Sequence, residues 1–201
     1  MKESDDIFSL CDEEPTPVVG SMLVAKPTVD DWCFSRSVSL VIDHGENGSM
    51  ALMMSHLSGF TVGDVMPQFE ALRNQPLFLG GPVGTDMLFY VHDLGSDIVP
   101  EALHIVDGLW LGGDLTALTL HCDLEPHFDI ERHVKFMIGY SGWTTGQLAD
   151  ELARHDWAVL DGDARRLLLL TPHDAMWQRA VERFGPRYHL WLNWPTDVAM
   201  N

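Results

Sequence analysis

Short apolar runs, separated by turn residues, recur along the chain between residues 20 and 140. Runs of roughly four to eight such residues, bounded by Gly, Pro, Asn or Asp, are typical of β-strands. The second and third runs flank a turn rich in Asn and Gly, which predicts a β-hairpin. The pattern predicts strands over 21–26, 37–42, 49–54, 77–79, 87–92 and 133–140.

Capping residues predict two helices among these strands. Thr61 is suited to cap a short helix over 62–72. Pro67 limits the regularity of that helix, because proline lacks the backbone N–H and clashes with the preceding turn. Asp114 is expected to cap a second helix that runs to about Leu120.

Two more helices are predicted in the last third of the chain. Thr144 and Gln147 have the spacing of a capping box, in which each side chain satisfies a backbone N–H of the other residue. Thr171 as N-cap places Pro172 at the first helical position, and Gly185 stands just past the end of that helix.

Between these two helices, Arg166 and the four leucines that follow it predict an interior strand over 166–170. Strands joined by hairpins, with helices inserted singly, favour a mixed and largely antiparallel sheet. The regular strand–helix alternation of a parallel sheet is absent. The pattern therefore predicts an α+β fold.

Length and composition predict one domain. With 201 residues, of which 46% are hydrophobic, the chain can build a core without a disulfide or a metal. Residues 1–17 form an acidic leader, and 18–201 form the single domain. Its tryptophan-rich tail, 188–195, is apolar enough to need a partner surface. The tail either packs on its own domain or contributes to a homo-oligomer.

Charge is the strongest compositional signal. The chain has 30 acidic and 12 basic residues, which give a net charge of −18. Nucleic-acid binding relies on Lys and Arg that neutralise phosphates. No basic cluster precedes the C-terminal third of the sequence, so direct binding to nucleic acid is not expected.

Cysteine usage and the N-terminal residues predict a cytoplasmic protein. Cys11, Cys33 and Cys122 are odd in number, widely spaced and without a C-x-x-C pair, which suits a reducing compartment. The first residues are acidic, whereas a signal peptide begins with basic ones. No stretch approaches 18 uninterrupted apolar residues, so no membrane span is expected.

Three local patterns resemble known sites. The Gly-rich segment 80–84 lacks the Gly-Lys-Ser/Thr of a phosphate loop, and Pro82 removes an N–H donor, so a tight turn is favoured over nucleotide binding. Ser141 stands in a G-x-S-x-G-like stretch, but Trp143 fills the last position, which a nucleophile elbow does not tolerate. The ligand-rich stretch 121–133 lacks zinc-site spacing, which favours a charged loop over a metal site.

Three blocks of sequence resemble the bacterial YqgE/AlgH family. The second block contains Gly-Gly-Pro and the third contains G-Y-x-x-W-x-x-G-Q-L, and together these two patterns are specific. The blocks occur in the family's order between about Gly20 and Gly185. They are 20–27 with 34–38, 43–44 and 48–50; 79–83 with 89–92; and 139–148 with 151–152 and Trp157.

The chain departs from the family pattern at several positions. The family usually has Asn-x-Pro after its third strand, where this chain has Ser55-His56-Leu57. Ala51 stands where the family has glycine. The position of Ser141 is often alanine in relatives, which further weakens a nucleophilic role for this serine.

The resemblance implies a curved, pseudo-barrel β-sheet flanked by helices. It implies little about activity, because the family is largely uncharacterised. One branch is labelled as a transcriptional regulator of alginate synthesis, without a recognisable DNA-binding motif. This chain also lacks a helix-turn-helix signature.

These observations predict a non-enzymatic binding or regulatory protein that contacts a protein or a small molecule. The motif residues suit turns and a pocket wall rather than proton transfer, and a pocket is expected where the Tyr140–Gln147 turn meets His92. The alternative is that these residues only build that corner. No catalytic residue, cofactor or metal is assigned. The candidate pocket residues are Gly80, Gly81, Pro82, His92, Tyr140, Trp143, Gly146 and Gln147.

Two other functions stay open. The first is a hydrolase-type enzyme that uses His92 or His44, with a nearby carboxylate, as acid and base. The second is direct regulation of transcription, which the charge opposes.

Overall fold

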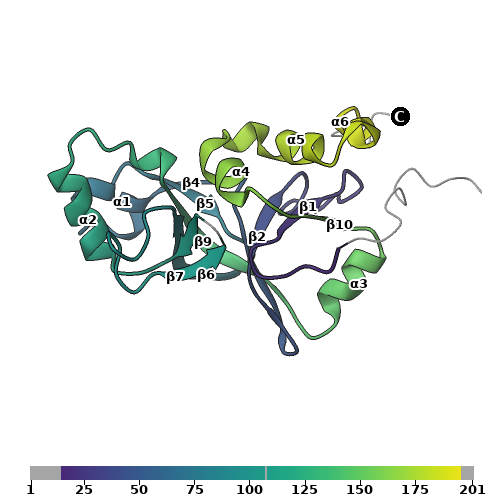
Figure 1. The fold of residues 1–201 in the computed structure, drawn as a ribbon, viewed down its shortest axis with the longest axis horizontal. Helices are drawn as coiled ribbons and strands as arrows, with labels where there is room; N and C mark the ends of the chain where they lie inside the picture. Colours follow the sequence, from purple (N-terminus) through teal and green to yellow (C-terminus); the bar gives the residue numbers. More distant parts are fainter. Residues whose placement is uncertain (1–14, 107, 196–201) are drawn as a thin grey trace, which may run out of the picture.

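The computed structural model describes residues 15–106 and 108–195, which form a large sheet flanked by helices (Figure 1). The strands are β1 Met22–Ala25, β2 Val38–Gly45, β3 Gly48–Met53, β4 Leu57–Thr61, β5 Pro76–Leu79, β6 Val83–His92, β7 Leu103–Val106, β8 Leu109–Leu111, β9 Val134–Trp143 and β10 Trp157–Leu160. The α-helices are α1 Val62–Val65, α2 Leu115–Leu124, α3 Gln147–Ala153, α4 Ala164–Leu170, α5 His173–Arg183 and α6 His189–Leu192. Short 3-10 helices span Glu70–Leu72, Ile130–Arg132 and Pro186–Tyr188.

Strand β9 connects the two halves of the sheet. The strand order is β10-β1-β2-β3-β9-β6-β8-β7, and β5 pairs with both β4 and β9. Strand β9 pairs antiparallel with β3 near one end and with β6 along its length. It pairs with β5 in parallel. The sheet is therefore mostly antiparallel and mixed at β5, as the sequence predicted.

The C-terminal helices close the main core. Helices α4, α5 and α6 lie together along one side of the sheet, whereas α2 and α3 lie at its opposite ends (Figure 1). Helix α5 buries one apolar stripe that includes Met176, Trp177, Ala180 and Val181. These side chains pack against residues of β1, β2 and β3 in one large cluster. The C-terminal helices therefore cover this side of the sheet.

The α+β class and the six predicted strands are confirmed, as is the hairpin of β2 and β3. The resemblance implied a pseudo-barrel, but the sheet stays open, because β10 and β7 lie at the two ends of the strand order. Strand β10 was not predicted, although all four of its residues are buried and it pairs with β1.

The predicted strand over 166–170 is wrong. This segment lies in helix α4, where Leu167, Leu168 and Leu169 are buried against the sheet. A short run of leucines has no period that separates a buried strand from a buried helix. The strand between the two predicted helices is β10, which comes before α4 in the chain.

Helix starts agree with the predictions to within a few residues. Thr61 caps α1, but the helix stops before Pro67 and resumes only as a 3-10 turn. Asp114 caps α2 through its side chain. Helix α5 begins at His173, one residue later than expected.

The predicted capping box at Thr144 is displaced. Helix α3 begins at Gln147, and its N-cap is Gly146, whose φ of 78° lies in the left-handed region. The expected side-chain contact nevertheless forms, because the backbone N–H of Thr144 donates to Gln147 Oε1 at 3.1 Å.

The described part of the tail packs on its own domain. Tyr188 and Trp191 are buried, and their rings contact each other and Phe184. Most of the acidic leader lies outside the described residues. No described helix is both long and apolar enough to span a membrane.

Candidate functional site

The Gly-Gly-Pro segment forms a close backbone crossing. The turn between β5 and β6 lies against β9, and a Cβ at Gly80 or Gly81 would clash with the β9 backbone at Gly139 and Tyr140. The predicted tight turn is confirmed, with φ of 153° at Gly81. Close approach of two backbones explains the two glycines without a ligand.

Trp143, Gly146 and Gln147 build the corner between β9 and α3. The indole N–H of Trp143 donates to Glu151 Oε2 at 2.7 Å, and Gln147 Nε2 donates to Glu151 Oε1 at 3.0 Å. Trp157 donates to the same carboxylate at 2.8 Å. This hydrogen-bond network stabilises the corner itself.

The structure does not bring this corner and His92 together. In the β6–β9 pair, His92 lies opposite Val134, whereas Tyr140 lies opposite Val83. Six residues along a strand span about 20 Å, so His92 and Tyr140 lie near opposite ends of β9. The pockets described below are lined by none of the eight candidate residues.

The histidines proposed for a hydrolase have different surroundings. His92 is fully buried, and its Nε2 contacts the carbonyl oxygen of Gly112 at 3.0 Å. Burial lowers the pKa of His92. His44 Nδ1 lies 2.7 Å from the hydroxyl of Ser49 in the β2–β3 hairpin. Neither histidine has a hydrogen bond to a carboxylate within the described chain.

The G-x-S-x-G-like stretch and the ligand-rich stretch 121–133 also have surroundings that fit a structural role. Ser141 is buried, and its hydroxyl donates to the carbonyl oxygen of Gly80 at 3.3 Å. His121 lies in helix α2 rather than in the expected charged loop, and the rings of His121 and His133 both contact Phe128. No three His, Cys, Asp or Glu residues in the described ranges are placed to hold a metal.

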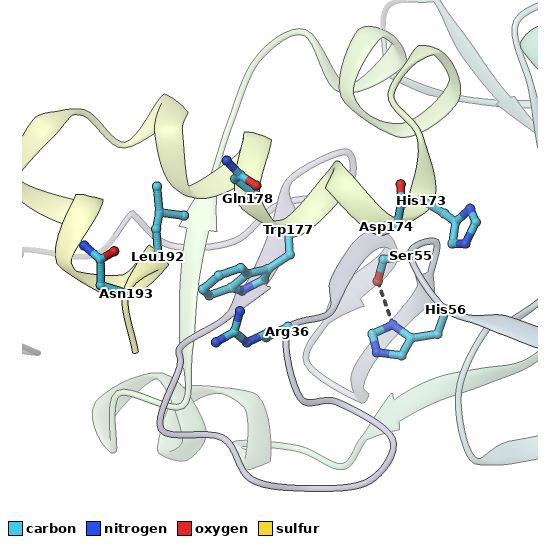
Figure 2. Close-up of a pocket in the computed structure, with 9 residues that line it drawn as sticks. All are labelled: Arg36, Ser55, His56, His173, Asp174, Trp177, Gln178, Leu192 and Asn193. Carbon is cyan, nitrogen blue, oxygen red and sulfur yellow. Dashed lines mark hydrogen bonds between the residues drawn. The ribbon is translucent and has the colours of Figure 1, made fainter. Parts of the chain in front are cut away.

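A pocket of about 550 Å³ lies between the end of β3 and helix α5 (Figure 2). Its walls come from four distant parts of the chain: the loop before β2, the segment after β3, the start of α5 and the end of α6. Its lining residues are Arg36, Ser55, His56, His173, Asp174, Trp177, Gln178, Leu192 and Asn193. We call it the α5 pocket.

Ser55 and His56 form an ordered hydrogen-bond chain in this pocket. His56 Nε2 donates to the carbonyl oxygen of Ser35 at 3.0 Å, since a carbonyl only accepts. Burial lowers the pKa of His56, which favours the neutral ring. Nδ1 then accepts from the Ser55 hydroxyl at 2.9 Å (Figure 2), and Ser55 Oγ accepts from the N–H of Val38 at 3.1 Å.

Arg36 supplies the permanent positive charge of the α5 pocket. Its guanidinium carbon lies 4.8 Å from the centre of the Trp177 ring, and Nη2 donates to the carbonyl oxygen of Trp194 at 2.5 Å. Its φ of 53° is unusual for a residue other than glycine. Such conformations cost energy and concentrate at functional sites. In the described structure, no carboxylate pairs with Arg36.

A second pocket adjoins the first at His173. It holds about 380 Å³ between β5, β9 and the α4–α5 connection, and Lys135 lines its inner wall. We call it the β9 pocket. A third hollow, between α4 and α5, is lined by both acidic and basic residues and has no buried polar side chain among them.

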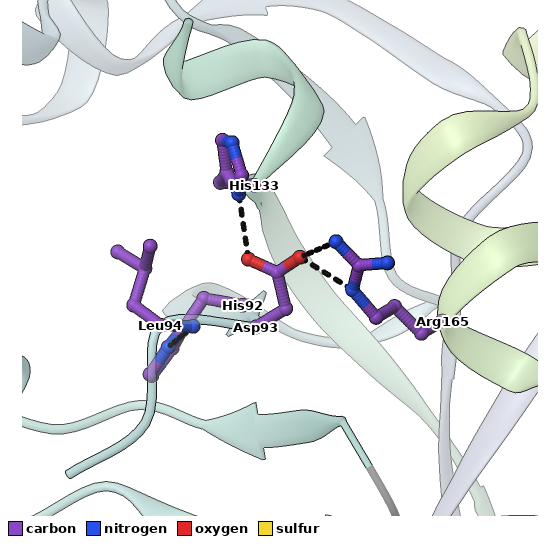
Figure 3. Close-up of polar contacts among 5 residues, drawn as sticks. All are labelled: His92, Asp93, Leu94, His133 and Arg165. Atoms are coloured by element: carbon purple, nitrogen blue, oxygen red, sulfur yellow. Dashed lines mark hydrogen bonds and ion pairs between the residues drawn. The ribbon is translucent and has the colours of Figure 1, made fainter. Parts of the chain in front are cut away.

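An ionic cluster ties the far end of β6 to α4 (Figure 3). The Asp93 carboxylate is only 4% exposed, and it accepts from Arg165 Nε at 2.6 Å and contacts His133 Nδ1 at 2.8 Å. These contacts satisfy both carboxylate oxygens, so the cluster stabilises the joint between sheet and helix. Its members line none of the three pockets.

Comparison with known proteins places the chain in a family. A model of AlgH-like proteins matches residues 22–189. The chain belongs to the AlgH-like family. It is 37% identical over the whole of both chains to a "UPF0301 protein" of Parabacteroides distasonis, and 36% identical over the same extent to one of Bacteroides thetaiotaomicron.

Two solved structures share the fold of this AlgH-like chain. The solution structure of the AlgH protein from Pseudomonas aeruginosa has a TM-score of 0.66 and 25% identity, and the match covers 91% of this chain and 97% of that one. A crystal structure of a Corynebacterium diphtheriae protein shares the fold, with a TM-score of 0.76 at 24% identity over 94% of this chain and 97% of that one.

Sequence reasoning missed the residues that line the α5 pocket. One signal was present: Ser55-His56-Leu57 stands where the AlgH-like pattern usually has Asn-x-Pro, and Ser55 and His56 line this pocket. His173 is half-buried and lines both pockets. Arg36 lies in the family block 34–38, but its unusual backbone and its stacking on Trp177 depend on the fold.

Proposed function

We propose that this AlgH-like protein is a binding protein that holds a small organic carboxylate in the α5 pocket. The observation that supports this most directly is Arg36, which is held against Trp177 and is not neutralised by any described carboxylate. A guanidinium presents five N–H donors in a planar fork that matches a carboxylate. One donor contacts Trp194, so the rest of the fork can face a ligand.

The other walls suit the same ligand. The amides of Gln178 and Asn193 supply neutral hydrogen-bonding groups, and the volume lies within the range of small-molecule sites. Asp174 is the only acidic residue among the described residues that line the pocket, whereas the whole chain carries −18. Because Asp174 would repel a second negative charge, a single carboxylate fits better than a phosphate ester.

The proposal places this binding in the cytoplasm, because the two described cysteines, Cys33 and Cys122, are free thiols. A role in regulation is compatible with ligand binding, and the protein would then act through a protein partner. Direct contact with DNA is not part of the proposal, because the chain carries a net charge of −18.

Calorimetric titration with butyrate and with L-lactate, each of which carries a single carboxylate, tests the binding proposal. We expect at least one of them to bind with a sub-millimolar Kd. Arg36→Lys keeps the charge but loses the planar fork, so we expect at least a tenfold weaker Kd, which corresponds to about 1.4 kcal/mol.

Arg73→Lys is the matched control, because Arg73 forms only an exposed pair with Glu70, and it should bind as the wild type does. If neither carboxylate binds at millimolar concentration, or if Arg36→Lys binds as tightly as the wild type, the proposal is wrong.

A second candidate function, ester hydrolysis, rests on the Ser55–His56 pair. Its geometry is that of a hydroxyl nucleophile and a base whose other nitrogen is fixed by a third group. In this alternative, Ser55 Oγ attacks the ester carbon while His56 Nδ1 takes the hydroxyl proton. The ester C–O bond then breaks, and the alcohol leaves with that proton. Water, deprotonated by His56, then cleaves the acyl–Ser55 ester and releases the acid. Ser55 is only 6% exposed and already accepts from Val38, which is why binding is the leading proposal.

Hydrolysis of p-nitrophenyl acetate separates the two functions. If the protein is a hydrolase, we expect turnover that Ser55→Ala lowers at least a hundredfold. Ser58→Ala is the control and should leave the turnover unchanged, because Ser58 lies outside this pocket and donates to the carbonyl oxygen of Leu77. Equal rates for the wild type and Ser55→Ala would remove this candidate.

A further inference from the structure

Lys135 is a buried amine that the proposed function does not use. It lies on β9 and is only 6% exposed. Its Nζ donates to the carbonyl oxygen of Met54 at 3.3 Å and lies 4.6 Å from the centre of the Phe78 ring. An ammonium has three N–H donors, and no carboxylate in the described chain pairs with this one. The buried charge is therefore poorly compensated.

The β9 pocket lies directly beside this amine. Phe78 and Lys135 form part of one wall, and the connection between α4 and α5 forms another. Most of the interior is apolar, whereas the charged and titratable groups that line the pocket besides Lys135 are Asp129, Glu131, Arg132 and His173. The lining apolar residues are Leu57, Pro76, Phe78, Val134, Phe136, Leu169, Leu170 and Pro172.

The environment favours the neutral form of the amine. Burial lowers the pKa of Lys135 from 10.5 to about 7, and the exposed rim groups include both signs of charge. A neutral amine has a free lone pair and is a nucleophile toward carbonyl carbons, whereas an ammonium is not. At neutral pH, Lys135 therefore has on the order of a thousandfold more neutral amine than an ordinary lysine.

We propose that Lys135 captures small, uncharged aldehydes or ketones in the β9 pocket as an imine. The Nζ lone pair attacks the carbonyl carbon and forms a C–N bond, while the carbonyl oxygen gains a proton. The resulting carbinolamine loses that oxygen as water, so one carbonyl and one amine give one imine and one water. The apolar interior and the two carboxylates at the rim favour an uncharged compound over an anion.

Reductive trapping with propanal and cyanoborohydride tests this inference. Hydride reduces the imine to a stable propyl-amine, which peptide mass analysis assigns to a residue. The chain has only three lysines, so Lys2 and Lys26 serve as internal references. We expect Lys135 to be labelled at least ten times faster than Lys2 near pH 7, with a rate that saturates as propanal increases, because the compound first occupies the pocket.

Two variants define the outcome. Lys135→Met should lose the label while the remaining lysines react as before, and Arg36→Lys should leave it unchanged, because the two pockets share only His173. Failure of this inference therefore leaves carboxylate binding unaffected. Labelling of Lys135 no faster than Lys2 in the folded protein, or without saturation, would overturn it.

Discussion

Gly81→Ala is expected to destabilise the fold by roughly 3 kcal/mol or more, which lies in the upper range for single substitutions. A Cβ at Gly81 would lie closer than 3.0 Å to backbone atoms of Tyr140 and Ser141, a distance that real Cβ atoms essentially never show. The backbone cannot rotate away as a side chain can. The substitution must therefore push β9 out of register with its neighbours.

Urea unfolding measures this effect, with Gly146→Ala as the matched control. Gly146 also has a positive φ, of 78°, but a Cβ there meets nothing within 4 Å. Its replacement should cost only the backbone strain of about 1–2 kcal/mol. Equal losses for the two variants would show that the crossing of the Gly-Gly-Pro turn and β9 is not as close as described.

Lys135→Met is expected to stabilise the protein below about pH 7, by up to about 5 kcal/mol. The pKa of Lys135 is lower in the folded protein, about 7, than the 10.5 of an ordinary lysine. Keeping the amine charged in the fold is therefore unfavourable. Methionine has a similar length, fills the same space and removes that cost.

The sign of the pH dependence follows from proton linkage. Between about pH 7 and 10.5 the unfolded state binds the Lys135 proton and the folded state has lost it, so wild-type stability rises with pH. The advantage of Lys135→Met should shrink by about 1.4 kcal/mol per pH unit above pH 7. Comparing the variants at each pH cancels the other titrating groups.

Denaturant unfolding from pH 6 to pH 9 gives this difference directly. The account is contradicted if the difference in unfolding free energy does not change with pH, or if the variant is less stable than the wild type at pH 6. Either result would show that the charge of Lys135 is solvated or compensated in the folded protein. The same result would remove the chemical basis for imine formation.

Local signals in the sequence were enough for most of the sheet. Six of the ten described strands and the β2–β3 hairpin were predictable because turn residues mark their ends, whereas β4, β7, β8 and β10 were not predicted. Helix α4 was not, because four consecutive leucines, 167–170, give the same apolar run in a strand and in a helix. Only the packing of α4 onto the sheet decides between these two structures.

The sites were much less predictable than the fold. The α5 pocket joins Arg36, the Ser55-His56 pair and residues of α5 and α6, which lie far apart in the sequence. The motif residues were easy to recognise but line none of the three pockets, because their roles are a backbone crossing and a corner. Lys135 carried no sequence signal, since its burial depends on β3, β5 and the α4–α5 connection.

A crystal structure of the protein with butyrate or L-lactate tests the central claim most directly. The account predicts a carboxylate in the α5 pocket, with its oxygens about 3 Å from the guanidinium nitrogens of Arg36. A ligand bound only elsewhere, or an α5 pocket without the carboxylate at saturating concentration, would contradict it.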